Sequence, residues 1–160
     1  MRSADEIVFK LATNVDENRL TDLIRQYYEF DQIPFVEDEI RSGLAAFLKD
    51  PSLGRAWLMM RERQSIGYVI MTFGADLELG GRIGIITDLY LEPEHRRKGY
   101  GREALRHVVA FCGGLGLRAL ELLVERDNVE AQALYKSFGF RAYDRFPMSK
   151  RINVTPLDTL

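Results

Sequence analysis

Apolar and polar positions recur with two different periods in the first part of the chain. Residues 7–12 form a short alternating run, which predicts a strand. Two stretches with helical spacing follow, and an Asp50-Pro51 pair ends the second one. Their apolar positions are Leu20, Leu23, Ile24, Tyr27 and Tyr28 in the first stretch, and Ile40, Leu44, Phe47 and Leu48 in the second. This part of the chain is therefore expected to fold as one strand and two helices.

Strand-like patterns dominate the middle of the chain. Residues 56–60 and 66–73 are rich in apolar side chains and are separated by a polar turn, so both are predicted to be strands. A Gly80-Gly81 pair then predicts a hairpin that leads into a third strand over residues 83–91. Pro93 ends this run, because proline has no N–H group to give to a sheet.

The last third of the chain returns to helical spacing. A helix is predicted to end at Gly113-Gly114, and residues 120–124 then alternate as a strand. Asn128 is a candidate N-cap for a further helix, and Gly139 is a natural end for it. Residues 140–152 are expected to form one or two closing strands. The apolar positions of the earlier helix are Leu105, Val108, Val109 and Cys112. The order of elements is typical of an α/β sheet of mixed direction.

Length, composition and charge indicate a single globular domain and argue against several classes of protein. The 160 residues suit a single domain over residues 1–160, and 46% of them are hydrophobic, which is enough for a sizeable core. A net charge of −2 and a pI near 5.8 argue against a general nucleic-acid binder. The single cysteine, Cys112, excludes an internal disulfide and lies at an apolar helix position, so it is expected in the core. The first ten residues lack the apolar run of a signal peptide, so a cytoplasmic protein without a membrane partner is expected.

One short stretch, EHRRKGYGREAL over residues 94–105, concentrates cations at a glycine-rich helix start. Such a turn points several free N–H groups into a small space, and the helix dipole adds partial positive charge there. Gly99 and Gly101 let the backbone approach a ligand closely. Full charges surround the turn, on Arg96, Arg97, Lys98 and Arg102. The stretch is therefore interpreted as a cradle for a pyrophosphate group.

Other phosphate-binding loops fit this stretch less well. A Walker A loop needs Lys followed by Ser or Thr after its last glycine, and Tyr100-Gly101-Arg102 does not supply that pair. A dinucleotide fingerprint would have Ala104 at its third glycine position and would lack its usual place at the first strand. A solvated charge run is the plain alternative, and nucleic-acid binding through the cluster is disfavoured by the overall acidity.

Two motifs resemble those of the GNAT superfamily of N-acetyltransferases. The first is Arg-x-x-Gly-x-Gly, here Arg96 to Gly101, which follows a strand ending in Leu89-Tyr90-Leu91-Glu92-Pro93. The second is NVEAQALYKSFGF over residues 128–140, which matches Asn-x-x-Ala-x-x-Leu-Tyr-x-x-x-Gly-Phe. The resemblance implies a mixed, mostly antiparallel sheet of six to seven strands flanked by about four helices, with a splayed parallel strand pair at its centre.

The resemblance also implies where acetyl-CoA binds. The donor would lie in the V between the strands over residues 83–91 and 120–124, with its pantetheine arm on the backbone of the first strand. The turn before the next helix would hold the pyrophosphate, and the second motif would contact the pantetheine arm and the sulfur. The implied donor-binding residues are Leu89, Tyr90, Leu91, Arg96, Arg97, Lys98, Gly99, Tyr100, Gly101, Arg102, Asn128, Ala131 and Tyr135.

The chemistry of acetyl transfer assigns roles to two of these side chains and to one backbone group. An ammonium ion has no lone pair, so a base or a water chain must remove a proton before the amine attacks the thioester. Asp88 is the candidate base, because the neighbouring Thr87 cannot act as one. The N–H of Leu91 is a candidate oxyanion donor, and Tyr135 is the candidate acid that protonates the leaving thiolate. Alternation places Leu89 and Leu91 on one face of their strand and Asp88 and Tyr90 on the other, unless a bulge intervenes.

The acceptor side carries no comparable motif. By resemblance the first helix and the loop after it line the acceptor pocket. The aromatic and acidic residues there would suit a cationic amine, carried by a small molecule or by a peptide. Candidate acceptor residues are Tyr27, Tyr28, Phe30 and Asp31. No metal site is expected, since neither His95 nor His107 has a Cys or His partner at ligand spacing. A homodimer and a non-catalytic module that binds coenzyme A both stay open, and Asp88 has an equally good structural interpretation as a turn cap.

Overall fold

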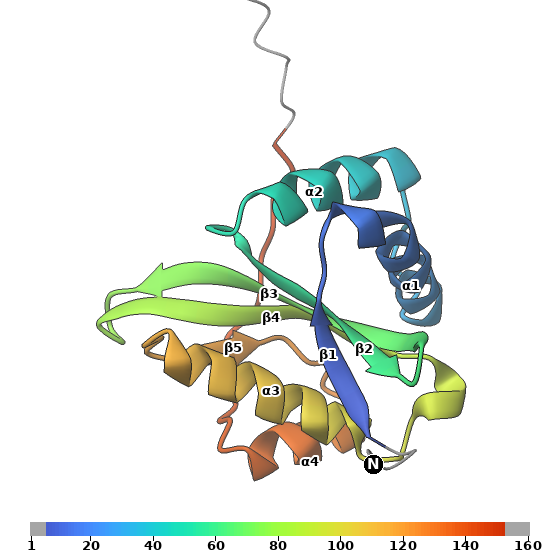
Figure 1. Ribbon diagram of the computed structural model, residues 1–160. Helices are drawn as coiled ribbons and strands as arrows, with labels where there is room; N and C mark the ends of the chain where they lie inside the picture. Colours follow the sequence, from blue (N-terminus) through green and yellow to red (C-terminus); the bar gives the residue numbers. More distant parts are fainter. Residues whose placement is uncertain (1–5, 153–160) are drawn as a thin grey trace, which may run out of the picture.

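The computed structural model describes residues 6–152, which form one sheet with helices on both of its faces (Figure 1). Two 3-10 turns, η1 (Asn14–Asp16) and η2 (Pro93–His95), interrupt the connections. The strands are β1 (Ile7–Leu11), β2 (Gly54–Arg61), β3 (Gln64–Asp76), β4 (Gly81–Leu91) and β5 (Leu120–Leu122). The α-helices are α1 (Glu17–Phe30), α2 (Glu37–Lys49), α3 (Tyr100–Gly114) and α4 (Val129–Ser137).

The sheet follows the order of the chain, β1-β2-β3-β4-β5. The first four strands pair antiparallel, with short turns between β2, β3 and β4 and with α1 and α2 between β1 and β2, and β5 pairs parallel to β4. The predicted hairpin between β3 and β4 is confirmed. Its turn contains Gly80 with φ of 79°, a backbone conformation that glycine adopts without steric cost.

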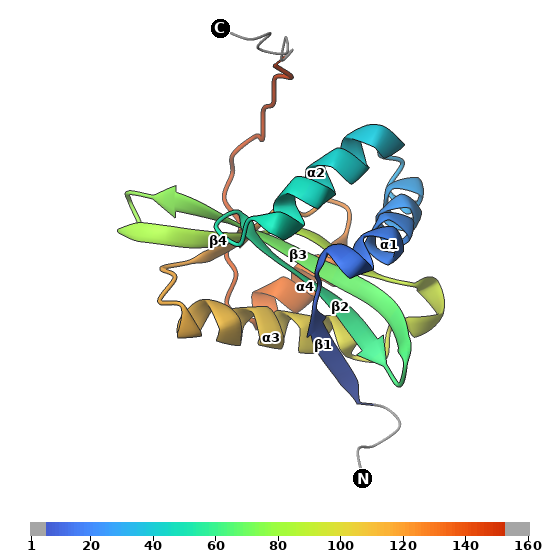
Figure 2. The ribbon, with the colours of Figure 1, turned by 45° about the horizontal axis from the view of Figure 1, so that its top comes forward.

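The helices cover the sheet in two pairs. Figure 1 and Figure 2 show α1 and α2 on one face, and α3 and α4 on the other. The core is divided accordingly, because alternate residues of each strand point to opposite faces. The cluster under α1 and α2 includes Leu20, Leu23, Leu44, Tyr68, Ile70 and Tyr90, and the cluster under α3 includes Trp57, Val69, Met71, Ile86, Leu105 and Cys112.

Helices α1 and α3 each bury a stripe of apolar side chains, α2 buries Leu44, and α4 has no fully buried residue. In α3 the stripe contains Ala104, Leu105, Val108 and Cys112, so the expectation of a core cysteine is confirmed. Burial raises the pKa of the Cys112 thiol, as its apolar surroundings disfavour the thiolate. Within residues 6–152 no helix combines the length and the hydrophobicity needed to cross a membrane.

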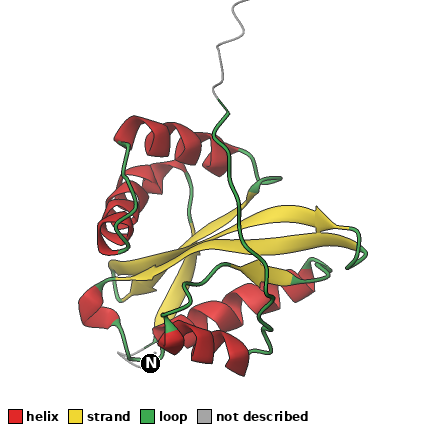
Figure 3. Cartoon of the chain, turned by 180° about the vertical axis from the view of Figure 1, so that it is seen from behind, coloured by secondary structure: helices red, strands yellow, loops and turns green. Residues whose placement is uncertain are grey.

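Two parts of the expected sheet are wrong for the described residues. Residues 140–152 contain no strand, so the sheet of the described chain has five strands rather than the six or seven expected. The parallel pair is also at the edge of this sheet and not at its centre, because within residues 6–152 no further strand lies beyond β5. The physical reason is that β5 has only three residues and offers little edge for another strand. Figure 3 shows residues 140–152 as a loop that passes from the α4 side of the sheet to the α2 side.

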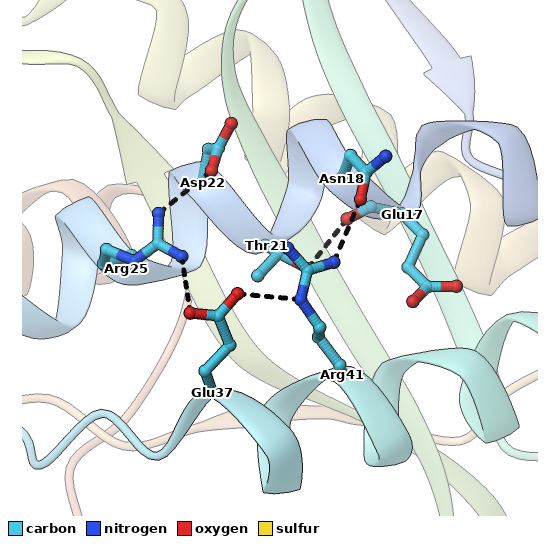
Figure 4. Close-up of polar contacts among 7 residues, drawn as sticks. All are labelled: Glu17, Asn18, Thr21, Asp22, Arg25, Glu37 and Arg41. Carbon is cyan, nitrogen blue, oxygen red and sulfur yellow. Dashed lines mark hydrogen bonds and ion pairs between the residues drawn. The ribbon is translucent and has the colours of Figure 1, made fainter.

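A network of hydrogen bonds and ion pairs joins α1 to the start of α2 (Figure 4). Glu37 of α2 accepts from Arg25 of α1 at 3.2 Å and from Arg41 at 2.9 Å. Arg41 also donates to Asn18 Oδ1 at 3.0 Å, and Arg25 donates to Asp22 at 3.0 Å. Exposed pairs of this kind contribute little to stability one by one, but the network sets the position of α2 relative to α1.

Candidate functional site

The sheet opens into a fork between β4 and β5. The two strands pair over only three residues on each side, Gly84–Ile86 and Leu120–Leu122. Beyond Ile86 the strand β4 continues to Leu91 and has no partner strand on that edge within the described chain. The carbonyl of Leu91 accepts from Arg96 Nε at 2.9 Å, and the other backbone groups on this edge are available to an extended ligand.

The direction of the backbone groups shows which residues face the fork. A Cβ atom added to Gly67 of β3 would lie 2.3 Å from the carbonyl oxygen of Tyr90, so that carbonyl points toward β3. The N–H of Glu92 also points there and donates to Ile66 O at 3.0 Å. Because direction alternates along a strand, Leu89 and Leu91 turn their backbone groups toward the fork. Of the three strand residues predicted to bind the donor, these two have backbone groups on the open edge and Tyr90 does not.

The turn between η2 and α3 presents free N–H groups. Arg97 and Gly99 both have left-handed backbone, with φ of 58° and 86°. The helical ladder begins with the N–H of Glu103, which donates to Gly99 O at 3.1 Å. The N–H groups of the three preceding residues, Tyr100 to Arg102, consequently have no acceptor in the helix. A Cβ atom at Gly99 would meet nothing within 4 Å, so a ligand has room to approach the backbone there.

The basic side chains of the turn have different placements. Arg96 lies inward: its Nε donates to Leu91 O at 2.9 Å and its guanidinium lies 4.2 Å from the centre of the Phe30 ring. Arg97, Lys98 and Arg102 are exposed and can reach an anion at the turn. The side chain of Arg96 thus connects β4 with α1, whereas the other three remain candidates for the phosphates.

Helix α4 positions the residues of the second motif. Asn128 accepts the N–H of Ala131 at 3.1 Å through its Oδ1 atom, which confirms it as the N-cap, and its amide N–H groups stay free for a ligand. Gly139 has φ of 89° and ends the helix as predicted. Tyr135 packs against the core cluster on the α3 side of the sheet, as Leu89 and Leu122 also do. Burial raises the pKa of Tyr135, so its hydroxyl keeps the proton that an acid must donate.

Asp88 lies immediately after an irregularity in β4. Ile86 pairs with Met71 and Asp88 pairs with Ile70, which leaves Thr87 as an extra residue opposite no partner. The hydroxyl of Tyr68, a fully buried residue of β3, donates to Asp88 Oδ2 at 2.8 Å. Burial raises the pKa of Asp88, although the hydrogen bonds from Tyr68 and Thr87 act in the opposite direction. A carboxylate with a raised pKa in a cavity is a candidate general base.

A cavity of about 300 Å³ lies between α1, α2 and the point where β4 leaves β5. Asp88 and Thr87 contribute to its wall, together with Ile24, Tyr28, Glu39, Ile40, Gly43, Leu44, Phe47 and Ile70. Of the four residues predicted to contact the acceptor, Tyr28 lines this cavity. The other three lie outside its lining. The ring of Tyr27 packs against that of Tyr90, with 5.8 Å between the ring centres, and Asp31 is beside Tyr27. The ring of Phe30 stacks with the guanidinium of Arg96.

The predicted alternation of side chains along β4 is confirmed. Leu89 contacts the core cluster under α3, whereas Tyr90 belongs to the cluster under α1 and α2, where Asp88 also faces. The two candidate catalytic side chains consequently lie on opposite faces of the sheet, Asp88 on the α1 side and Tyr135 on the α3 side. Sequence reasoning missed Tyr68. The available signal was alternation along β3, because Tyr68 lies two residues before Ile70 and therefore on the same face as Ile70 and Asp88.

Sequence reasoning also missed a set of hydrogen bonds from Arg19 to residues at the end of β4 and the start of β3. Arg19 of α1 donates to the hydroxyl and the carbonyl of Ser65, both at 2.6 Å, and to Glu92 at 2.7 Å. Glu92, Glu94 and His95 each place a potential metal-ligand atom within 4.8 Å of the others, a group that a search for Cys and His partners overlooks. The Glu92 carboxylate already has Arg19 as its counter-ion, which explains its burial without a metal.

Comparison with known proteins assigns this architecture to a family. The model of the acetyltransferase (GNAT) family matches residues 18–140, which is most of the chain. The chain belongs to the GNAT family. The resemblance found in the two motifs is thereby confirmed, and the match extends upstream of them to α1.

Individual relatives are similar over parts of the sequence or over the fold. A Bacillus subtilis (strain 168) protein named "putative ribosomal protein bS18-alanine N-acetyltransferase" is 38% identical over 56 residues, 35% of this chain and 37% of that protein. The match to the uncharacterized N-acetyltransferase YhfO of the same organism covers 40% of that protein, so the chain aligns with less than half of either curated relative.

Solved structures match over nearly the whole length. An integron cassette protein from the Cole Harbour Salt Marsh metagenome has a TM-score of 0.80 and 28% identity, covering 95% of this chain and 93% of that one. A predicted acetyltransferase from Clostridium acetobutylicum, solved with acetyl-CoA, has a TM-score of 0.77 and 20% identity, covering 91% and 96%. The fold of this GNAT member is thus that of its family.

Proposed function

We propose that the chain is an N-acetyltransferase that transfers an acetyl group from acetyl-CoA to a primary amine in a ternary complex. The observation that carries this proposal is the junction of two features at Thr87. The open edge of β4 begins there, and the wall of the cavity that holds Asp88 includes the same residue. An acetyl group that enters along the fork would meet an amine that enters through the cavity.

The residues of the α1 side would prepare the amine. Tyr68 occupies one oxygen of the Asp88 carboxylate, Oδ2, and fixes its orientation. The other oxygen can accept a proton from an ammonium ion, which exposes the nitrogen lone pair. Proximity of the two substrates supplies much of the remaining acceleration.

The residues of the fork would stabilise the charges that develop. Acetyl-CoA supplies a thioester: the bond between nitrogen and the carbonyl carbon forms, and the carbon–sulfur bond breaks with its electron pair on sulfur. The N–H of Leu91, on the open edge, can donate to the carbonyl oxygen as it becomes negative. The attacking nitrogen loses its second proton to solvent water, and Tyr135 can give its proton to the thiolate and recover one from that solvent. Ammonium and acetyl-CoA thus yield an amide, free coenzyme A and one proton.

The proposal is tested by release of free thiol from acetyl-CoA with a panel of primary amines. Tyr135→Phe is expected to lower kcat by about 10²-fold or more, the usual contribution of a positioned acid, with the affinity for acetyl-CoA nearly unchanged. Tyr143→Phe is the matched control, because Tyr143 is exposed in the loop after α4. Equal kcat in both variants would remove Tyr135 from its role. Binding of coenzyme A without turnover of any amine would favour a non-catalytic binding module.

A further inference from the structure

Gly43 occupies an unusual place in the middle of α2. Glycine is less favourable than alanine inside a helix, because it loses more backbone freedom on folding. Its backbone has no left-handed conformation that would require glycine, and a Cβ atom there would meet nothing within 4 Å. Gly43 does line the cavity that contains Asp88. The missing side chain therefore enlarges this cavity, and neither packing nor backbone geometry accounts for it.

Most of the rest of the cavity wall is apolar. Its apolar side chains are Ile24, Ile40, Leu44, Phe47 and Ile70, and Tyr28 and Thr87 each add an uncharged hydroxyl group. Two carboxylates lie in the wall, Asp88 and Glu39, and they differ in their partners. Glu39 forms a solvent-exposed ion pair with Arg151 from the loop after α4, so it is already engaged with a cation. Asp88 receives hydrogen bonds and has no cationic partner among the described residues, so it is the carboxylate of this cavity that is open to a positive charge.

Resting on the proposed acetyltransferase activity, we propose that the acceptor is a small monoamine with a compact apolar body, which lies beside Gly43 with its amine at Asp88. A polyamine or an aminoglycoside would bring further ammonium groups against apolar walls, where an unpaired charge is strongly disfavoured. A volume of about 300 Å³ is at the small end for ligand sites, which suits an arylalkylamine or a short alkylamine.

Equilibrium binding to the chain saturated with coenzyme A tests the acceptor class separately from catalysis. The apolar monoamine probes are 2-phenylethylamine and hexylamine. The competing probes are spermidine, a polyamine, and a tetrapeptide with an N-terminal alanine. We expect the first pair to bind at least about tenfold more tightly, and the same order in kcat/KM from thiol release. Equal or tighter binding of spermidine or the peptide overturns the inference. Absence of thiol release, with the expected binding order, overturns only the proposed function.

Substitution of Gly43 tests the cavity itself. Gly43→Leu fills the space beside α2, so kcat/KM is expected to fall with the size of the amine, by at least about tenfold for 2-phenylethylamine and much less for ethylamine. Gly43→Ala is the matched control: it restores a helix former at little cost in volume, and it is expected to raise the melting temperature. Affinity for acetyl-CoA should stay the same in both variants. A uniform loss over all amines in Gly43→Leu would contradict a role in acceptor size.

Discussion

The two faces of the sheet build their halves of the site from different atoms. On the α3 side, the fork and the turn before α3 present backbone N–H groups, and the glycine at position 99 keeps the approach open. On the α1 side, the cavity is shaped by side chains from two helices and two strands, and its wall includes the Asp88 carboxylate. A site made of backbone atoms tolerates changes in most of its side chains, whereas a site made of side chains changes its ligand with each of them. Substitutions on the two sides should consequently separate donor binding from acceptor chemistry.

The largest expected effect is on the α1 side. Asp88→Asn removes the candidate base and should lower kcat by about 10² to 10⁴-fold, while calorimetry finds acetyl-CoA affinity unchanged. Burial raises the pKa of Asp88, so its contribution to stability is full below its ordinary pKa and is lost as pH rises through the raised value. The variant should therefore unfold at the same temperature as the parent or higher at pH 7. Full activity in Asp88→Asn would leave only a structural role for this carboxylate.

An intermediate effect is expected on the α3 side. Gly99→Val places a branched side chain at a left-handed position in the candidate phosphate turn, and it should weaken acetyl-CoA binding by about tenfold or more. Gly116→Val is a matched control at the far end of α3, where φ is 67° and the space around the Cβ position is also open. Both variants should lose similar stability in thermal unfolding. Equal loss of acetyl-CoA affinity in the two would show that strain alone, and not blocked approach, is responsible.

The smallest expected effect sharpens the assignment of the base. Tyr68→Phe removes the hydrogen bond that favours the Asp88 carboxylate, so the pKa of Asp88 should rise further. The acidic limb of the kcat/KM profile would then move to higher pH, with a loss of activity near neutrality that is recovered at alkaline pH. A profile that keeps its shape and only falls in height would indicate that Tyr68 supports the fold rather than the base.

The sequence was informative where the backbone itself carries the signal. Glycine favours the left-handed backbone found at Gly99 in the turn and at Gly139 at the helix end, so these two features could be predicted, whereas the left-handed Arg97 carries no such signal. The contact between Tyr68 and Asp88 depends on the extra residue at Thr87, and alternation alone does not reveal such a bulge. The family match supplies the fold, but it leaves the acceptor pocket to packing between residues far apart in the chain.

The wrong prediction of closing strands has a similar origin. Residues 140–152 contain apolar and polar positions that resemble a strand, but a strand needs a partner with free backbone groups. The neighbouring β5 is three residues long, and Tyr143, Phe146 and Met148 are exposed in the structure. The pattern of a single segment carries no information about the length of the edge on which it would pair.

The guanidinium of Arg19 has a consequence for how the two substrates influence each other. It belongs to α1, which contributes Ile24 and Tyr28 to the cavity wall, and it holds Ser65 of β3 and Glu92, which lies just ahead of the loop proposed to receive the diphosphate. Any tilt of α1 to admit a larger amine would pull on that loop through Arg19 and through Arg96, which also connects β4 with α1. Occupancy of one half would then alter the affinity of the other, a thermodynamic coupling that works equally in both directions.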